Sequence, residues 1–189
     1  HGFRSQERAT VSIMLTGVND FPISQDIPLA AFEDGGAITA GFVGDDVDND
    51  DDIDSLIYSI VTNLDAGEGT LVNNDDGTFT FDPGADFQEL AEGQTLDVSF
   101  TYKATDRHDA DSNLATVTIT VTGVNDNPTA VADIRSVAQN VVTNEAAEGV
   151  LGNDDEPDTN DTKIVTKLNG TDLDGVTNSL TITSTRGAQ

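Results

Sequence analysis

Alternating apolar and polar positions predict β-strands along most of this chain. In LDVSFTYKAT the residues that share one face by strict alternation are Leu96, Val98, Phe100, Tyr102 and Ala104. In TVTITVT the apolar positions are Val117, Ile119 and Val121, and threonines occupy the positions between them. An alternation of period two is the mark of a strand with one buried face and one solvated face.

Two further stretches, LIYSIVT and GTFTFDP, read as strands, because Asn, Asp, Gly and Pro bound them. No long stretch shows a helical period with caps, although DFQELAEGQ could hold one helical turn. Many short strands with turns between them predict an all-β fold, an antiparallel Greek-key β-sandwich.

The chain repeats itself. Residues 9–22 read ATVSIMLTGVNDFP and residues 115–128 read ATVTITVTGVNDNP, with ten of fourteen positions identical at a spacing of 106 residues. A period of about 100 residues is the size of one domain, so the sequence predicts a tandem array. The expected organisation is a last strand of an upstream repeat in 1–18, a complete module in 19–126 and the first part of a following repeat in 127–189.

On this division the third module lacks its final strands, and such a module exposes a sheet edge. The strand carrying Val11, Ile13 and Leu15 is of the type that the third module lacks. We therefore expect that this strand could fill the gap, within one chain or between two chains.

The net charge of the chain limits the partners that it can bind. Lys plus Arg number 8 and Asp plus Glu 35, giving a net charge of −27, which argues against nucleic acid as a partner. Such a charge opposes a compact fold unless cations offset it, although a merely well-solvated surface is an equal alternative. Cys is absent, which excludes disulfides and thiolate sites, and no stretch is apolar enough to predict membrane insertion.

Carboxylates are densest in GDDVDNDDDID, residues 44–54, between two predicted strands. A hard cation such as Ca²⁺ takes six to eight oxygen ligands, so this loop, which includes Asp50, is the expected best metal site. The alternative is a solvated acidic loop. The run is not an EF-hand, because counting from Asp46 the sixth position is Asp51 rather than Gly and the twelfth is Ile57 rather than Glu.

Further acidic positions stand at strand ends. Asp106 ends FTYKATD, and the dipeptides Asn19–Asp20 and Asn125–Asp126 each begin a linker shortly before a proline. Asn and Asp are ordinary turn residues, and this alone would explain the dipeptide in one linker. It explains less well why the same dipeptide occurs in both linkers.

These motifs together resemble cadherins. ITVTGVNDNP is similar to the cadherin linker DxNDNxP, VGDDVDNDDDIDSLIYSI to a DxD pair ahead of a YSI strand, and FTYKATD to the AxD motif. The phrases GTFTFDP and FQELAEGQTLDVSFTYKATD further resemble bacterial cadherin-like repeats of the VCBS and Rhizobium-adhering-protein type. The resemblance covers 19–126 and the first half of the third module, and it implies a cadherin- or Ig-like sandwich.

The resemblance also implies Ca²⁺ between successive modules. At the N-terminal end of the complete module, the residues that match the family's ligands are Asn19, Asp20, Asp46, Asp48 and Asp106. At the other end they are Asn125, Asp126, Asp154 and Glu156, with Glu in place of the second Asp of the DxD pair. Glu33, in FEDGG, is a looser match to an early acidic ligand, and Gly17 and Gly123 replace the first Asp of the linker motif.

The sequence offers no case for an enzyme. His108 lies in a polar turn, where a lone His is most often solvated, and no serine has a nucleophile-elbow pattern around it. The expected function is that of a calcium-binding module of an extracellular bacterial adhesin, in which Ca²⁺ stiffens the joints between neighbouring repeats. The rival is a Ca²⁺-dependent lectin-like module for polysaccharide or cell-surface ligands. Against it, Trp is absent and Tyr58 and Tyr102 occupy positions expected to be buried.

Overall fold

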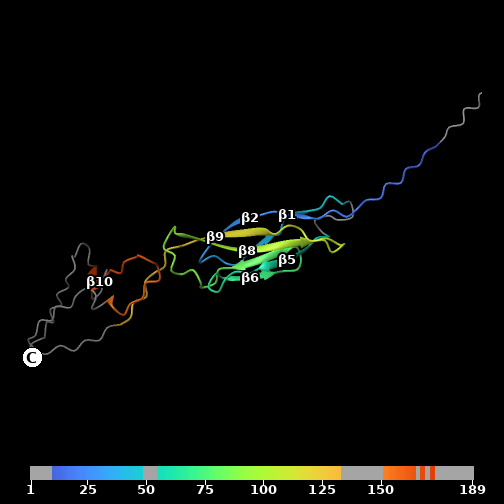
Figure 1. The fold of residues 1–189 in the computed structure, drawn as a ribbon. Coiled ribbons are helices and arrows are strands. Elements are labelled where there is room, and N and C mark those ends of the chain that lie inside the picture. The colour runs from blue at the N-terminus through green and yellow to red at the C-terminus, as the bar shows by residue number, and fades with distance from the viewer. Residues whose placement is uncertain (1–9, 49–54, 133–150, 165–166, 169–170, 173–189) are drawn as a thin grey trace, which may run out of the picture.

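The computed structural model describes residues 10–48, 55–132, 151–164, 167–168 and 171–172 of the chain. Two sheets form the body of the module between residues 22 and 122 (Figure 1). The four-stranded sheet has the order β2 (Ile27–Phe32), β9 (Ala115–Thr122), β8 (Thr95–Thr105) and β5 (Ile57–Thr62). The three-stranded sheet has the order β3 (Ile38–Gly41), β7 (Thr78–Asp82) and β6 (Thr70–Asn73). The predicted all-β, sandwich-like fold is confirmed.

Two further pairs of two-residue strands lie outside these sheets. β1 (Ile23–Ser24) pairs with β4 (Gly44–Asp45) where the chain enters the module. β10 (Lys167–Leu168) pairs with β11 (Thr171–Asp172) in the C-terminal part of the chain.

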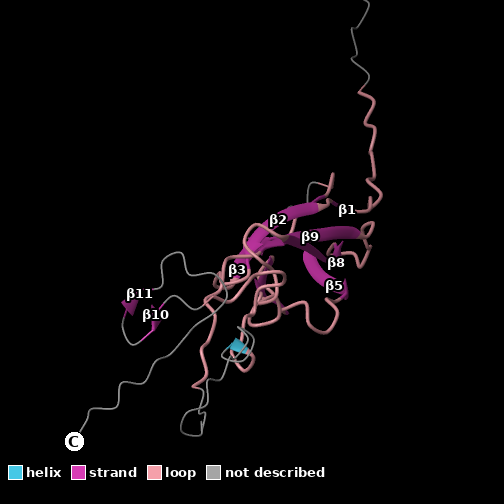
Figure 2. Ribbon diagram, turned by 90° about the vertical axis from the view of Figure 1, so that its left-hand side faces the viewer, coloured by secondary structure: helices cyan, strands magenta, loops and turns pink. Residues whose placement is uncertain are grey.

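One strand pair departs from the antiparallel expectation. β2 and β9 run parallel, with Ile27 opposite Val117 and Phe32 opposite Thr122, and lie side by side in Figures 1 and 2. The reason is topological, because β2 opens the module and β9 closes it, and both run from the end where the chain enters to the end where it leaves. The other pairs within the two sheets are antiparallel.

The core follows the predicted alternation. The inward residues of β9 are fully buried, and on β8 the alternation holds from Val98 to Ala104. Leu96 is the exception, with 47% of its surface exposed. The first three residues of β8 are all exposed.

Aromatic rings join the two sheets. Phe42 stacks on Tyr58 with ring centroids 5.1 Å apart and lies 4.9 Å from Phe79 and 4.8 Å from Tyr102. The Tyr102 hydroxyl donates to the backbone oxygens of Gln25 at 2.6 Å and Val43 at 2.9 Å. Tyr102 therefore fixes the segments on either side of β2 and β3 to the core of the four-stranded sheet.

The stretch DFQELAEGQ forms turns rather than the expected helical turn. The Leu90 N–H donates to the Phe87 oxygen at 2.9 Å, and Phe87 is 2% exposed in the core. Gly84, just before the stretch, and Gly93, near its end, have φ values of 59° and 77°, a left-handed backbone that cannot continue an α-helix. This loop lies against Gly123, where an added Cβ would meet the Leu90 oxygen at 2.3 Å.

Segments outside the sandwich carry the remaining predictions. Residues 10–20 belong to no strand, and Val11, Ile13 and Leu15 are 80–90% exposed, so in this single chain they do not complete another sheet. Pairing of this strand between two chains stays a prediction. Residues 49–54 of the acidic run, Asp50 among them, lie outside the described residues. The expected module boundaries also remain predictions.

Candidate metal centre

Three carboxylates meet at the end where the chain leaves the sandwich. Glu33, Asp126 and Asp158 each offer an oxygen within 4.8 Å of those of the other two. Glu33 is 1% exposed and Asp158 is 4% exposed. Buried charges in such proximity are costly unless a cation or protons offset them.

Glu33 is placed by the end of the parallel strand pair. Its N–H donates to the Thr122 oxygen at 3.1 Å, which continues the β2–β9 ladder by one step. Its Oε1 accepts the Val124 N–H at 2.6 Å, while Oε2 is buried without a hydrogen-bond partner in the structure. The side chain thus holds the exit linker with one oxygen and leaves the other for a further ligand.

Asp158 reaches the same place from the following segment. Its Oδ2 accepts the Asp126 N–H at 2.9 Å, and its own N–H donates to Oε1 of Glu156 at 3.3 Å. Oδ1 of Asp158 and Oδ2 of Asp126 are buried and have no hydrogen-bond partner in the structure. With Oε2 of Glu33, three carboxylate oxygens therefore lack a partner in one small region.

The crowding of these carboxylates shifts the pKa values of two of them. Burial raises the pKa of Glu33 above its ordinary value, and the charges of Asp126, Asp34 and Asp158 raise it further, against the lowering effect of the Val124 N–H. Burial followed by repulsion from Asp34 and Asp158 also raises the pKa of Asp126. Both shifts indicate that negative charge here is short of compensation.

A second group of carboxylates overlaps the first. Glu156, Asp158 and Asp161 also offer oxygens within 4.8 Å of one another, with Asp158 common to both groups. The loop that carries them is joined to the sandwich by the Thr159 N–H, which donates to the Glu89 oxygen at 3.0 Å. Among the described residues, these are the groups of three or more such side chains close enough to share an ion.

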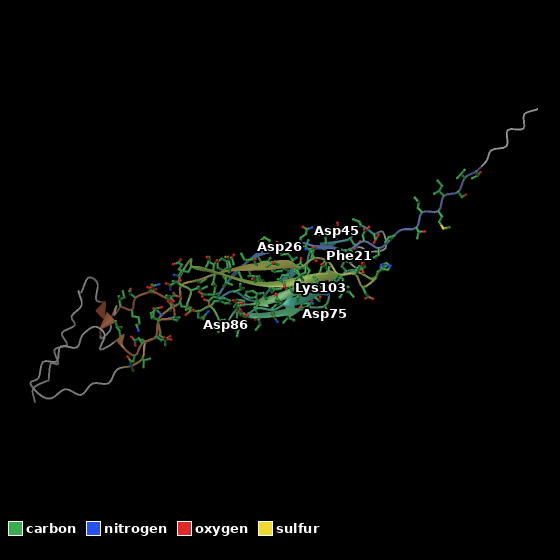
Figure 3. All side chains as sticks on the ribbon, in the orientation of Figure 1. Phe21, Asp26, Asp45, Asp75, Asp86 and Lys103 are labelled. Atoms are coloured by element: carbon green, nitrogen blue, oxygen red, sulfur yellow. The ribbon has the colours of Figure 1, made fainter. Side chains whose placement is uncertain are left out.

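The other end of the module repeats part of this arrangement. The Asp20 N–H donates to Oδ2 of Asp48 at 2.8 Å, and the Asp48 N–H donates to Oδ1 of Asp46 at 2.9 Å. Oδ2 of Asp46 is buried and has no hydrogen-bond partner in the structure. Phe21 and Asp45 mark this entry end in Figure 3.

Asp106 connects the entry linker to the sandwich. Its Oδ2 accepts from Nδ2 of Asn19 at 2.8 Å, and its Oδ1 accepts the N–H groups of His108 at 2.8 Å and Ala110 at 2.7 Å. Burial raises the pKa of Asp106, but the hydrogen bonds from Asn19, Ala110 and His108 outweigh it and leave that pKa below its ordinary value. Asp106 is therefore held ionised, and the buried Oδ1 of Asn19 beside it is unpartnered in the structure.

The two ends share two hydrogen bonds. Asp126 and Asp158 make the contact that Asp20 and Asp48 make, and Glu156 stands in the position of Asp46. The motif resemblance instead pairs Asp154 and Glu156 with the DxD motif, and that assignment stays a prediction. The hydrogen bonds favour Glu156 and Asp158 as the alternative pair.

The remaining predicted ligands lie beside these groups. Asp154 does not join the grouped carboxylates, and its Oδ1 accepts the Val131 N–H at 2.7 Å. The amide of Asn125 donates to the Asp126 oxygen at 2.9 Å, as that of Asn19 does to Asp20 at 2.8 Å. The sequence motifs did not point to Asp158 or Asp161. One signal was available, because Glu156 and Asp158 are separated by a single residue, as Asp46 and Asp48 are.

The chemistry of both ends suits a hard cation. Such ions prefer carboxylate and carbonyl oxygens, and the five unpartnered oxygens at the two ends are all of this kind. No His or thiolate takes part, which is unlike the usual ligand set of Zn²⁺. The residues present therefore fit Ca²⁺ better than a softer metal.

A comparison with known families shows to which family the chain belongs. The sequence profile described as the bacterial cadherin-like domain matches residues 19–123, which is more than half of the 189 residues. The chain belongs to the bacterial cadherin-like domain family. The predicted family is thereby confirmed, and this cadherin-like module belongs to a family of structural domains.

Solved structures with a similar arrangement include two single human domains. The third cadherin domain of human protocadherin 7 has 18% identity and a TM-score of 0.39, covering 62% of this chain and 98% of that domain. The PKD domain of human KIAA0319 has 9% identity and a TM-score of 0.39, covering 64% of this chain and 100% of that domain.

Protocadherin gammaB7 EC3-6, solved as a cis-dimer, is also similar to the cadherin-like chain. It has 10% identity and a TM-score of 0.33, covering 64% of this chain and 26% of that one. The comparison with curated proteins gives no match. Among the described residues of the cadherin-like chain, no helix has the length and apolar character needed to cross a membrane.

Proposed function

We propose that this module is a calcium-binding structural element of an extracellular bacterial adhesin, and that Ca²⁺ stiffens the joint between it and the segment that follows. The observation that carries the proposal is the buried pair of Glu33 and Asp158. They come from the sandwich and from the following segment, and each presents an unpartnered oxygen in one group of carboxylates.

In this proposal, Glu33 and Asp158 would hold the cation at the exit linker. Glu33, fixed by the Val124 N–H, and Asp158, fixed by the Asp126 N–H, would both ligate the ion at the exit linker. A bound divalent cation supplies the positive charge that offsets their repulsion. Without it, repulsion between these carboxylates would loosen the linker, so the ion would convert a loose joint into a stiff one.

The entry end supports the same role. Asn19, Asp20, Asp46, Asp48 and Asp106 are the ligands proposed there. The unpartnered oxygens of Asn19 and Asp46 indicate that this end also has room for a cation ligand. In a tandem array, the equivalent end groups would give every joint the same dependence on Ca²⁺. Stiff spacing of this kind suits a long cell-surface protein in adhesion or biofilm formation.

A polysaccharide-binding role has less support. Tyr58 and Tyr102 are 7% and 0% exposed, so neither ring offers a platform on which a sugar could stack. A glycan array at fixed Ca²⁺ concentration separates this alternative from the structural role, since a spacer binds none of the glycans.

The test of the proposal is a thermal melt with and without Ca²⁺. With free Ca²⁺ at a hundred times its Kd, binding to the folded form should add about 2.7 kcal/mol, and Mg²⁺ should add less. The Asp158→Asn variant should lose most of the response of the exit end. Asp75→Asn is the matched control, since Asp75 is exposed in a distant turn whose φ of 58° Asn also tolerates. Coincident melts with and without Ca²⁺ would refute the proposal.

A further inference from the structure

The entry and exit of the module lie at opposite ends of the sandwich. The chain enters beside β1 and leaves after β9, and Figure 1 shows the two linkers directed away from each other. Any pull along the chain therefore acts through Pro22 at one end and Val124 at the other. At the entry end the pull passes through the two-residue strand β1 into β2, and at the exit end it acts directly on β9.

Those two strands are parallel neighbours. Their register joins six consecutive residue pairs, from Ile27 with Val117 to Phe32 with Thr122. A pull on the start of β2 and on the end of β9 slides the strands along each other. Because ladder bonds lie across the strands, a sliding displacement loads all of them together rather than one after another.

Side chains and loops extend this pair at both ends. On the entry side, Oδ1 of Asp26 accepts the Thr116 N–H at 2.7 Å. The Ser24 N–H donates to Oδ1 of Asn113 at 3.1 Å, and the amide of Asn113 donates back to the Ser24 oxygen at 2.9 Å. Force that arrives at Ser24 is therefore passed to the segment that leads into β9.

The exit side is held in the same way. The Glu33 N–H bonds to Thr122, and the Glu33 carboxylate bonds to the Val124 N–H. Gly123 adds two backbone bonds to the loop before β8, donating to the Gln94 oxygen at 2.8 Å and accepting from the Gly93 N–H at 3.1 Å. The last residues of β9 thus cannot peel away from the sandwich without breaking several bonds at once.

We infer that the parallel β2–β9 pair is a mechanical clamp that bears tensile load along the module. This inference goes beyond the calcium-dependent joint and does not depend on it, because every contact that carries it is a hydrogen bond within the sandwich. Resistance to unfolding under force is a rate property, set by how many bonds must break in the first step.

Single-molecule pulling in two directions tests the clamp. The chain has no cysteine, so paired Cys substitutions give unique attachment points for handles. Phe21→Cys with Asn127→Cys pulls the two strands in shear. Gly36→Cys with Asn127→Cys places both handles at the exit end, where β9 is peeled one bond at a time. Each of these positions is exposed, and a side chain at Gly36 meets nothing within 4 Å.

With EDTA present, the shear direction should need roughly twofold or more force than the peeling direction at the same pulling speed. Equal forces in the two directions would overturn the inference. Because EDTA removes Ca²⁺, failure of the clamp and failure of the calcium proposal are separate results.

Proline variants locate the resistance. Successive N–H groups of a strand point to opposite sides, so either Leu29→Pro or Ala30→Pro removes a bond from β2 to β9. At least one of the two should lower the shear force by roughly a third or more. The matched controls are Leu71→Pro and Val72→Pro on β6, the edge strand of the other sheet, which should leave the shear force unchanged. Urea unfolding of each variant identifies those that fold, and a loss of force confined to β6 variants would contradict the assignment.

Discussion

The carboxylate of Asp158 accepts the backbone N–H of Asp126 at 2.9 Å, across 32 residues of sequence. Asp48 accepts the N–H of Asp20 at 2.8 Å across 28 residues at the opposite end of the module. Both ends therefore tie a linker aspartate to an acidic loop by the same bond. This repeated contact favours Glu156 and Asp158 over Asp154 and Glu156 as the acidic pair of the following segment.

The first prediction separates Asp158 from its neighbour Asp154. Asp158→Asn should lower Ca²⁺ affinity at the exit end by about tenfold or more, because it removes a buried charged ligand. Asp154→Asn, which keeps an oxygen for the Val131 N–H, should change that affinity little. Calorimetric titration of Ca²⁺ into each variant measures the difference. Equal losses in both variants would return Asp154 to the ligand set.

The second prediction concerns Glu33 without metal. Because its pKa is raised in the folded chain, Glu33 contributes stability that is fully present below its unfolded pKa and is lost as pH rises through the folded pKa. Glu33→Gln is neutral at every pH and keeps an acceptor for Val124. In EDTA, this variant should be more stable than the parent at neutral pH, and the difference should shrink as pH falls toward 4.5, the ordinary pKa of Glu.

Urea unfolding across a pH series measures this effect, and addition of Ca²⁺ should make the parent more stable than Glu33→Gln. In EDTA at neutral pH, a Glu33→Gln variant less stable than the parent would contradict the crowding of carboxylates at the exit end.

Asp106 supplies the opposite case, since its pKa is lowered in the folded chain. Its contribution is present above its unfolded pKa and is lost as pH falls through the folded value. Asp106→Asn should therefore be less stable than the parent at neutral pH.

The third prediction uses the repeated glycine of the two GVND motifs. An added Cβ at Gly123 would lie 2.3 Å from the Leu90 oxygen and 2.4 Å from the Ala91 oxygen, and both contacts are with backbone. Gly123→Ala should therefore cost about 1–3 kcal/mol, as other overpacked sites do. At Gly17 an added Cβ meets nothing within 4 Å, so Gly17→Ala is the matched control and should be neutral. Urea midpoints compare the two variants, and equal stabilities would mean that the loop moves aside freely.

The fourth prediction tests the hydroxyl of Tyr102. Tyr102→Phe keeps the ring in the aromatic core but removes the hydroxyl that donates to the backbone oxygens of Gln25 and Val43 and accepts the Val43 N–H. We expect a loss of about 0.5–1.5 kcal/mol in the free energy of unfolding for a hydrogen bond lost in this way. Tyr58→Phe is the control, because the Tyr58 hydroxyl is buried and has no hydrogen-bond partner in the structure. A larger loss for Tyr58→Phe would show that the hydroxyl of Tyr102 is not what fixes these segments.

Much of the fold could be predicted because strand periodicity is a local signal. Val117, Ile119 and Val121 are buried as the alternation requires, and Tyr58 and Tyr102 are buried as expected. The direction of β2 relative to β9 was not predictable in this way, since pairing depends on residues about 90 positions apart. Gly84 and Gly93 could have warned against a helical turn in DFQELAEGQ, but their positive φ values appear only in the structure.

The candidate site was predicted less completely, for a physical reason. A metal site is a meeting of distant segments, and Glu33 meets Asp126 and Asp158 only through the fold. The motif resemblance supplied Glu33 and Asp126, but it pairs Asp154 and Glu156 with the DxD motif and so does not include Asp158. Composition alone favoured the run of 45–54, of which the structure describes only the first positions.

The bond from Asp158 back to Asp126 also bears on how the protein is divided for study. A fragment that stops at residue 126 keeps every strand of the sandwich but loses Asp158, Asp161 and the backbone bond from Thr159 to Glu89. Such a fragment would lack the counterpart of the buried Glu33. The smallest piece that keeps both groups of exit-end carboxylates runs to residue 161, so a piece cut where the sandwich ends cannot be used to test the proposed ion site.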